Sequence, residues 1–335
     1  MPSSTSHSES RLPRTALLLA VTALVAVATA VGYSLRLNPE VRFYTRGLEI
    51  KRAWAGTLRA AHSNIVVVAG ASTTAFSVDG ERMLQRHGLP VVNMGLHAGM
   101  EASFLVGASS DLLKRGDRLV LELDPVLLAE PFSSPDVAAQ LGVAVGRPDW
   151  IHATHVTGEP VHWVANIVSL RPGAYHAFTL LGKAILRKPL YRYRVEDIHT
   201  SGWQQTAVRE PFIEDPPPAK GLAGDARRLL LATKRWCDTN GVEICYSLVW
   251  RYSSDEGRAE FQRRNIRYLR EILEIMPVLK DAELGAHARK DHFADVGAHL
   301  NADGAASRTD ALAGELKARA YWSLAELEAL EQQKR

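Results

Sequence analysis

A serine, a histidine and an aspartate stand where they could together build an activated nucleophile. Ser72 lies in Gly70-Ala71-Ser72-Thr73-Thr74, directly after the apolar run Ile65–Ala69. Asp295 and His299 stand near the other end of the chain, in Asp295-x-x-x-His299-Leu300-Asn301-x-x-Gly304. An aspartate that holds a histidine, which in turn removes the serine proton, makes the hydroxyl reactive toward esters. The pattern predicts acyl transfer or ester cleavage, with Ser72 as nucleophile, His299 as base and Asp295 as the orienting carboxylate.

Each of these residues also has a plain structural interpretation. A serine after a buried strand is most often a tight-turn residue or a helix cap, and a lone histidine is more often structural than catalytic. His287 and His292 compete with His299 for the role of base, and Asp291 competes with Asp295. We favour His299 because a helix is predicted to begin directly after it, from about residue 303.

The elements that would position these residues alternate between strands and helices. Continuous apolar runs are typical of strands buried on both faces of a parallel sheet. Strands are predicted at residues 65–69, 89–93, 118–123, 242–248 and 277–280, and helices at 76–87, 101–113, 225–239, 256–274 and 303–318. Such units predict an α/β fold, a three-layer doubly wound parallel sheet. Sites in open sheets of this kind lie at the carboxyl edge, where Ser72 is expected.

The stretch from about 125 to 220 interrupts this alternation. It is rich in proline and carries scattered aromatic residues and histidines, which are Trp150, His152, His155, His162, Trp163, Tyr175, His176, Tyr191, Tyr193 and Trp203. We interpret it as a mid-chain insertion that covers the carboxyl edge of the sheet. Its aromatic rings could stack on sugar rings.

The N-terminal part indicates a membrane anchor. Residues 1–14 are polar and predicted to be disordered, and Thr15–Leu35 contains no charged residue. This run has about the 20 residues that a helix needs to cross a bilayer. A buried core helix and a signal peptide cleaved after Ala28-Thr29-Ala30 are the alternatives. We favour an uncleaved transmembrane helix because the apolar run continues past that site.

The anchor is expected to continue into a stalk helix at residues 36–62, and the chain to end in a helical tail at 321–335 around an α/β domain at 63–320. Flanking positive charge does not decide the orientation of the anchor. Two arginines precede it, whereas more basic residues follow it, Arg36, Arg42, Arg46, Lys51 and Arg52, which leans against an outward-facing domain. Long domains can cross the membrane largely regardless of this charge.

Composition excludes several classes of function. The chain has 335 residues, 46% of them hydrophobic, and a net charge of +3, with no basic block that would indicate a nucleic-acid partner. Cys237 and Cys245 are too few for a disulfide framework or a zinc site. A single bridge between them is the alternative, and two buried free thiols are favoured. No motif predicts a metal or a cofactor. Gly70-x-Ser72-x-x-Ala75 is only loosely similar to a dinucleotide-binding loop, since it lacks the second and third glycines.

Three segments resemble the SGNH/GDSL hydrolase superfamily. They are Gly70-Ala71-Ser72 after the first strand, Asn93-Met94-Gly95 after the second, and the Asp295–His299 loop before the last helix. An N-terminal anchor with this domain resembles proteins of surface-polymer modification, such as those of D-alanylation and alginate O-acetylation. The first block here has alanine in place of the usual aspartate. The spacing between aspartate and histidine is one residue longer, and the Gly-x-Asn-Asp block is replaced by Glu122-Leu123-Asp124-Pro125.

The resemblance implies the roles of further residues. Ser72 would be the nucleophile, Gly95 would donate its backbone N–H to the oxyanion, and Asn93 could replace the missing asparagine. It implies an extracytoplasmic esterase or O-acyltransferase acting on ester groups of a carbohydrate or surface polymer, with a membrane-bound acyltransferase as a possible partner. The alternative is a catalytically inactive binding or assembly subunit of a cell-envelope modification system.

Overall fold

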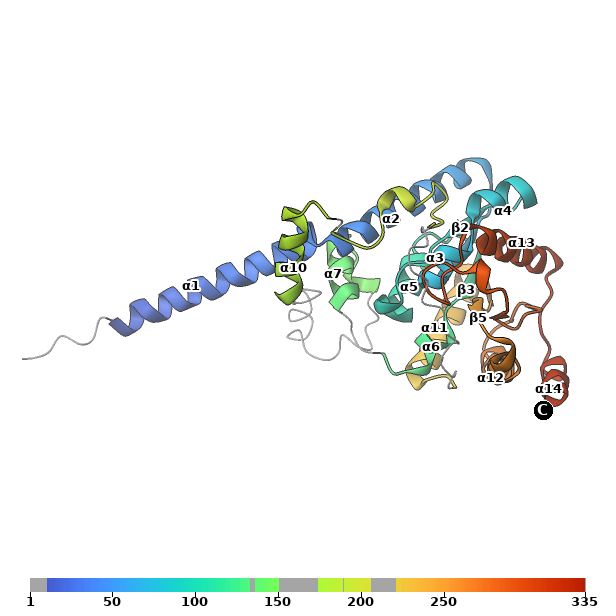
Figure 1. Cartoon of the computed structure of the whole chain (residues 1–335). Helices are drawn as coiled ribbons and strands as arrows, with labels where there is room; N and C mark the ends of the chain where they lie inside the picture. The colour runs from blue at the N-terminus through green and yellow to red at the C-terminus, as the bar shows by residue number, and fades with distance from the viewer. Residues whose placement is uncertain (1–10, 133–135, 151–173, 189, 206–220, 335) are drawn as a thin grey trace, which may run out of the picture.

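The described residues form an α/β fold around a parallel four-stranded sheet (Figure 1). The computed structural model describes residues 11–132, 136–150, 174–188, 190–205 and 221–334. The strands are β1 (Val66–Gly70), β2 (Val91–Asn93), β3 (Arg118–Glu122) and β4 (Glu243–Tyr246), in the order β2-β1-β3-β4. The α/β class and the parallel sheet are as predicted from the sequence. Val278 extends the sheet only by a single parallel bridge to Tyr246, where a fifth strand was expected.

Helices cover both faces of the sheet because its side chains alternate between them. On one face, Val67, Ala69, Leu119 and Ile244 share a core with α2 (Pro39–Ala61), α5 (Glu101–Ser110), α11 (Gly224–Asn240) and α12 (Asp255–Leu273). On the other face, Val68, Val120 and Cys245 pack with α4 (Gly80–His87) and α13 (Ala302–Ala318). Cys237 and Cys245 are both buried free thiols, as expected.

The strand order β2-β1-β3-β4 has a topological switch point between β1 and β3, because the connections from β1 to β2 and from β2 to β3 run on opposite faces of the sheet. The path from β1 to β2 runs through α3 (Ser72–Ser77) and α4, whereas the path from β2 to β3 runs through α5 on the other face. Gly70 and Glu122 are paired across this switch point. Ligands of open α/β sheets bind in the crevice outside such a point, and Ser72 begins α3 just beyond it.

The helix predicted at residues 76–87 is two helices. α3 ends at Ser77, and Asp79 caps α4 by accepting hydrogen bonds from the N–H groups of Glu81 and Arg82. The break leaves carbonyl groups of α3 without helical partners. The Asn93 side chain occupies this gap, as described below.

α2 is part of the domain, which corrects the expectation of a stalk helix at residues 36–62. Its buried face contains Val41, Tyr44, Leu48, Lys51, Ala55 and Leu58. These spacings of three and four residues place one continuous stripe of the helix against the core. Lys51 sits in this stripe, and its Nζ donates to the carbonyls of Asn93 and Gly202 at 2.8 and 2.5 Å.

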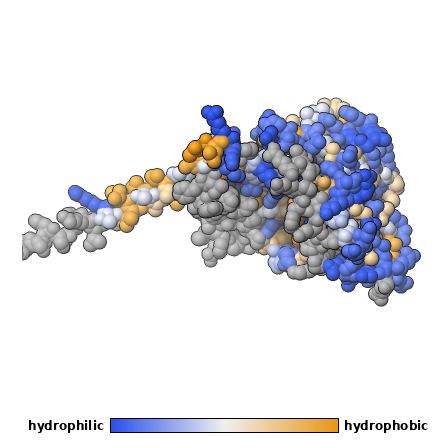
Figure 2. Space-filling model, in the orientation of Figure 1, coloured by the Kyte–Doolittle hydropathy of each residue, from blue (hydrophilic) through white to orange (hydrophobic). Residues whose placement is uncertain are grey.

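α1 (Arg11–Gly32) projects away from the domain (Figure 1). With the π-helical turn η1 (Tyr33–Leu37) it gives a 24-residue span, Arg14–Leu37, with mean hydropathy 2.2 and none of the tested window buried. Figure 2 shows its hydrophobic surface beside a largely hydrophilic domain. By length and composition this helix can cross a membrane, and a signal sequence meets the same criteria. Residues 11–14 belong to it instead of to the predicted tail, whose first ten residues lie outside the described ones.

The described parts of the insertion are mostly helical. They are α6 (Pro125–Ala129), α7 (Asp136–Ala144), η3 (Pro148–Trp150), α10 (Ala174–Ile185) and η4 (Val195–Asp197). Its final segment covers the end of α3, because Trp203 Nε1 donates to the Phe76 carbonyl and the Gln204 N–H to that of Ala75. His152, His155, His162 and Trp163 lie outside the described residues. At the end of the chain, α14 (Leu324–Gln333) packs on α12, in agreement with the expected helical tail.

Candidate active site

Asp295 and His299 face each other across a tight hairpin. The Ala294 N–H donates to the His299 carbonyl at 2.8 Å, and Phe293 bridges Leu300 in antiparallel fashion. His299 Nδ1 lies 2.8 Å from Asp295 Oδ1. The turn thus accommodates the three intervening residues that distinguish this spacing from the resembled family. Since Nδ1 is directed to the carboxylate, Nε2 is the nitrogen left to act as base.

Asp295 is held by residues of the insertion as well as by His299. Its Oδ2 accepts from the Tyr193 hydroxyl at 3.1 Å and pairs with Arg192 at 2.7 Å. Burial alone would raise the pKa of Asp295, but the His299 hydrogen bond and the Arg192 charge outweigh it and lower the pKa. The carboxylate therefore stays ionised, which is the state that orients and stabilises an imidazolium.

The His299 ring lies on α3, one turn from Ser72. It stacks on the Phe76 ring with the centroids 4.2 Å apart and the planes at 24°. Ser72 and Phe76 are separated by four residues on α3, so their side chains lie on the same face of the helix, with Cβ atoms about 5–6 Å apart. The fold thus brings the Asp295–His299 pair, from near the end of the chain, against the helix that Ser72 begins.

Ser72 is the first residue of α3 and is half-buried, with Ala71 as the N-cap. In the part of the chain that the structure describes, no hydrogen bond joins the Ser72 hydroxyl to His299. Backbone N–H groups in a first helical turn lack helical acceptors. In α3 these are the N–H groups of Ser72, Thr73 and Thr74, because the Ala75 N–H already donates to the Ala71 carbonyl.

Gly95 and Asn93 are engaged in the fold, which differs from their predicted oxyanion role. The Gly95 N–H donates to Asn93 Oδ1 at 2.8 Å. Asn93 Nδ2 donates to the carbonyls of Thr74 and Val78 at 2.9 and 2.7 Å, so it closes the break between α3 and α4. Gly95 is required for close packing, since a Cβ at this position would lie 2.2 Å from the Ala75 backbone nitrogen. Both residues therefore position α3.

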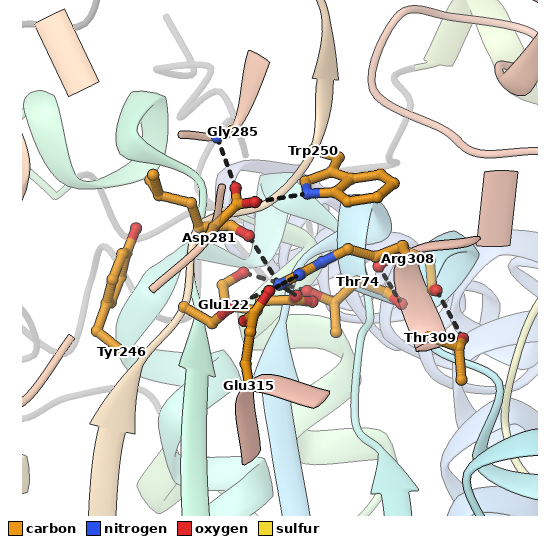
Figure 3. Close-up of polar contacts among 12 residues, drawn as sticks. Thr74, Glu122, Tyr246, Trp250, Asp281, Gly285, Arg308, Thr309 and Glu315 are labelled. Atoms are coloured by element: carbon orange, nitrogen blue, oxygen red, sulfur yellow. Dashed lines mark hydrogen bonds and ion pairs between the residues drawn. The ribbon is translucent and has the colours of Figure 1, made fainter. Parts of the chain in front are cut away.

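The acidic residues after β3 are also paired. Asp124 caps α6 and forms an ion pair with Arg251 at 2.5 Å. Glu122 binds Arg308 of α13, whose guanidinium is fully buried (Figure 3). Arg308 Nη2 donates to Glu122 at 2.8 Å, Ser247 Oγ at 2.6 Å and the Leu248 carbonyl at 3.0 Å, and Nη1 donates to Glu315 at 3.0 Å.

The Arg308 network contains several carboxyl groups, and the single positive charge of Arg308 cannot neutralise all of them if they are ionised. Asp281 lies close by, where it accepts hydrogen bonds from Trp250 Nε1 and the Gly285 N–H (Figure 3). Burial raises the pKa of Glu315 to about 7, against the attraction of Arg308 and with the repulsion of Asp281 and Glu122. Burial likewise raises the pKa of Glu122. This network ties α13, which follows the His299 hairpin, to the end of β3.

The rival candidates, His287, His292 and Asp291, have other partners. His287 Nε2 and His292 Nδ1 are 2.9 Å apart, and the His287 ring stacks on Trp250 at 4.4 Å. Burial, with the nearby charges, lowers the pKa of His287 to about 4. Asp291 is exposed and pairs with Arg289 at 2.7 Å. Among the described residues, no group of three or more His, Cys, Asp or Glu side chains could hold a metal ion.

Sequence reasoning missed two groups at the site and gave a third another role. Arg192 and the ring of Phe76 were not singled out, and Tyr193 was expected to stack on sugars. The Tyr193 hydroxyl instead holds Asp295 across 102 positions of sequence. The two-residue spacing of Tyr191 and Tyr193 was the only sequence feature that pointed to this segment, and it does not predict which residues the two side chains contact.

Comparisons with known proteins add no assignment. No family model matches the chain, and no curated protein or solved structure shows significant similarity to it. The resemblance to the SGNH/GDSL superfamily therefore remains a prediction that rests on the residues quoted above.

Proposed function

We propose that this chain is a membrane-anchored serine esterase or O-acyltransferase. Ser72 would attack an ester carbonyl, His299 Nε2 would accept its proton, and the acyl group would rest on Ser72 before transfer to water or an acceptor hydroxyl. In the same proposal α1 is an uncleaved anchor and the domain is extracytoplasmic. The substrate would be an ester of a carbohydrate or surface polymer, with a membrane-bound acyltransferase as a possible partner.

One observation carries the catalytic part of the proposal. The Asp295–His299 pair lies against α3 one turn from Ser72, just outside the switch point of the sheet. The residue types of a catalytic triad, a serine from one segment and an aspartate–histidine pair from another, therefore lie near the same helix, which supports the proposal. A substrate-induced rotation of the Ser72 side chain would bring it to Nε2, since catalytic hydrogen bonds often tighten only in the substrate complex.

A serine-directed fluorophosphonate probe tests the nucleophile. The full chain should be labelled, and Ser72→Ala should lose the label. His299→Ala should lose nearly as much, because residues of a triad act as a unit. Asp295→Asn should lose less than His299→Ala, since the carboxylate orients the base and is not itself attacked.

Ser77→Ala is the matched control for Ser72→Ala. Ser77 lies on the same helix, and its hydroxyl donates to the Thr74 carbonyl at 3.3 Å, away from the predicted chemistry. It should keep the label of the wild type. Labelling that survives Ser72→Ala, or that disappears equally in Ser77→Ala, would refute Ser72 as the nucleophile.

A second candidate is a catalytically inactive subunit that binds or assembles a surface polymer. The engaged Gly95 N–H and the absence of an asparagine after β3 favour it, because both weaken the predicted oxyanion hole. This candidate predicts no probe labelling of the wild type under conditions that label a known serine esterase. Polymer retention by the full chain, unchanged in Ser72→Ala, would then support it.

The orientation of the domain is tested separately. Alkaline phosphatase fused after Arg335 should be active, because the enzyme folds only outside the reducing cytoplasm. A fluorescent cytoplasmic reporter at the same position should be silent. The reverse pair of results would place the domain in the cytoplasm and remove surface polymers as substrates.

A further inference from the structure

A cavity of about 670 Å³ lies where the apolar helix meets the domain. Its walls come from the end of η1, the first turns of α2, the end of α7 and the segment 190–195. They include Leu35, Leu37, Phe43, Val143, Leu190 and Tyr193. The volume is within the range of about 300–1,000 Å³ that is usual for small-molecule sites.

The polar part of this cavity is basic. Arg36, Arg42 and Arg46 line it together with one acid, Glu49. Glu49 pairs with Arg46 at 2.6 Å, and no ion pair of Arg36 or Arg42 is found in the described ranges. A cavity with apolar walls and excess guanidinium groups matches an amphiphile with an anionic head, since guanidinium binds phosphate in a bidentate way.

The end of α10 provides a second sign that a bilayer surface lies at this place. Leu181, Ile185 and Leu186 are 58%, 72% and 66% exposed, and Arg187 and Lys188 follow them. Leu190, a few residues further on, lines the cavity beside Leu35. In Figure 1 α10 is drawn across the junction of α1 and α2, and Figure 2 shows a hydrophobic patch there. Exposed leucines next to basic residues are typical of segments that lie in a membrane interface.

We propose that this cavity binds the headgroup of an anionic phospholipid from the bilayer that holds α1. The phosphate would be bound by Arg42 and Arg46, with Arg36 at the entrance. The glycerol end of the lipid would lie along Leu35, Leu37 and Leu190. The inference rests on the proposal that α1 remains in the membrane, and it does not require Ser72 to react.

Tyr193 connects this cavity to the candidate active site. Its ring lines the cavity, whereas its hydroxyl donates to Asp295 Oδ2 at 3.1 Å. A bound lipid would therefore lie one side chain away from the Asp295–His299 pair. On the proposed function, this is where an ester carried by a membrane lipid would reach the enzyme.

Photo-crosslinking of the full chain in lipid nanodiscs tests the lipid site. Phosphatidylglycerol with a diazirine on its headgroup should label peptides containing Val143 and the segment 190–195. Phosphatidylcholine with a diazirine at the same place should not. Arg42→Gln combined with Arg46→Gln should reduce the label at least about tenfold, as expected when a charge-assisted hydrogen bond is lost.

Two further variants separate binding from loss of the fold. Glu49→Gln frees Arg46 from its partner and should increase labelling by phosphatidylglycerol, which an unfolded protein could not do. Lys114→Gln removes an exposed basic residue that lies neither in the cavity nor at the end of α10, and should leave the label unchanged. Equal labelling by both lipids, no label in the cavity, or equal loss in Lys114→Gln would overturn the proposal.

The test also separates this inference from the proposed function. Ser72 does not line the cavity, so Ser72→Ala should be labelled by the lipid as strongly as the wild type. Lipid labelling without fluorophosphonate labelling would support the lipid site and refute the esterase. Fluorophosphonate labelling without lipid labelling would support the esterase and refute the lipid site.

Discussion

At the scale of single residues, Lys51 is a buried lysine bound by carbonyl groups. It is 3% exposed, and no carboxylate in the described part of the chain pairs with it. Burial lowers its pKa to about 7. Two carbonyls, from β2 and from the insertion, are thereby fastened to α2. The Lys51 amino group loses its hydration and instead links three segments of the chain through these hydrogen bonds.

The stability of the protein should therefore rise with pH through the effect of Lys51. Between about pH 7 and 10 the unfolded lysine is protonated while the folded one is largely neutral, so folding is favoured as protons are removed. The slope is at most about 1.4 kcal/mol per pH unit. Denaturation of the full chain in mild detergent, at pH 7 and 9, should show this rise in the wild type and less of it in Lys51→Met. An equal rise in both proteins would contradict the assignment.

The candidate site was predictable from residue types only where chemistry and local spacing coincide. Ser72, Asp295 and His299 could be named because each follows a strand or precedes a helix. The Tyr193 contact to Asp295 and the use of the Gly95 N–H by Asn93 could not be predicted. Both depend on tertiary neighbours, and the sequence around Gly95 is equally compatible with an open loop and a closely packed one.

At the scale of elements, the position of α3 depends on the loop that follows β2. Gly95 passes against the α3 backbone, and Asn93 holds the break between α3 and α4. The position of Ser72 thus depends on the segment 93–95, which is not adjacent to it in the sequence.

Gly95→Ala should destabilise the protein, because the added methyl group meets backbone atoms that cannot move aside. Overpacking of this kind costs about 1–3 kcal/mol, and occasionally more. Gly56→Ala is the matched control, since Gly56 is exposed on α2 and nothing lies within 4 Å of a methyl group added there. It should stabilise the protein by up to about 1 kcal/mol. A Gly95→Ala protein that loses activity but keeps its melting temperature would restore the oxyanion role.

The Arg308 network predicts an opposite pH effect on stability. The pKa of Glu315 is about 7 in the folded state and 4.5 without the fold, so the folded state binds more protons between these values. Stability should accordingly be highest below pH 4.5 and should decline as pH rises through 7, by at most about 1.4 kcal/mol per unit. Glu315→Gln, which keeps an acceptor for Arg308, should lessen this decline. Denaturation midpoints at pH 5 and 7 measure it.

The elements themselves were predicted unevenly. The strands and α5, α11, α12 and α13 follow clear apolar patterns, and their observed bounds lie close to the predicted ones. The burial of α2 was missed because Lys51 interrupts its apolar stripe and hid the periodicity of Val41, Leu48 and Leu58. The strand order could not be predicted from the sequence either. The right-handed crossover rule does not determine on which side of β1 the strand β2 pairs.

At the scale of the whole molecule, the boundary between the apolar helix α1 and the domain lies before α2. Asn38 is 1% exposed, caps α2 and donates to Gln140 of α7. A shortened chain that begins at Arg36 should therefore be soluble and folded, whereas the full chain should fractionate with membranes. Beginning at Gly56 removes Val41, Tyr44 and Leu48 from the core, at about 2–5 kcal/mol for each large side chain.

Gel filtration and circular dichroism distinguish these chains. The chain from Gly56 is expected to aggregate or to lack a cooperative unfolding transition. If it folds like the chain from Arg36, α2 is a separable stalk after all. Full-length protein recovered in the soluble fraction with its N-terminus intact would refute the membrane anchor.

The junction between α1 and α2 limits how the domain can search for its targets. Only η1 and Asn38 separate the apolar helix from a helix that belongs to the core. A flexible tether would let a domain sample a volume that grows with its contour length. Here that length is close to zero, so on the proposal that α1 stays in the membrane the domain would diffuse in two dimensions together with α1. The effective concentration of ligands at the bilayer surface would then be high, and polymer strands further away would be beyond reach.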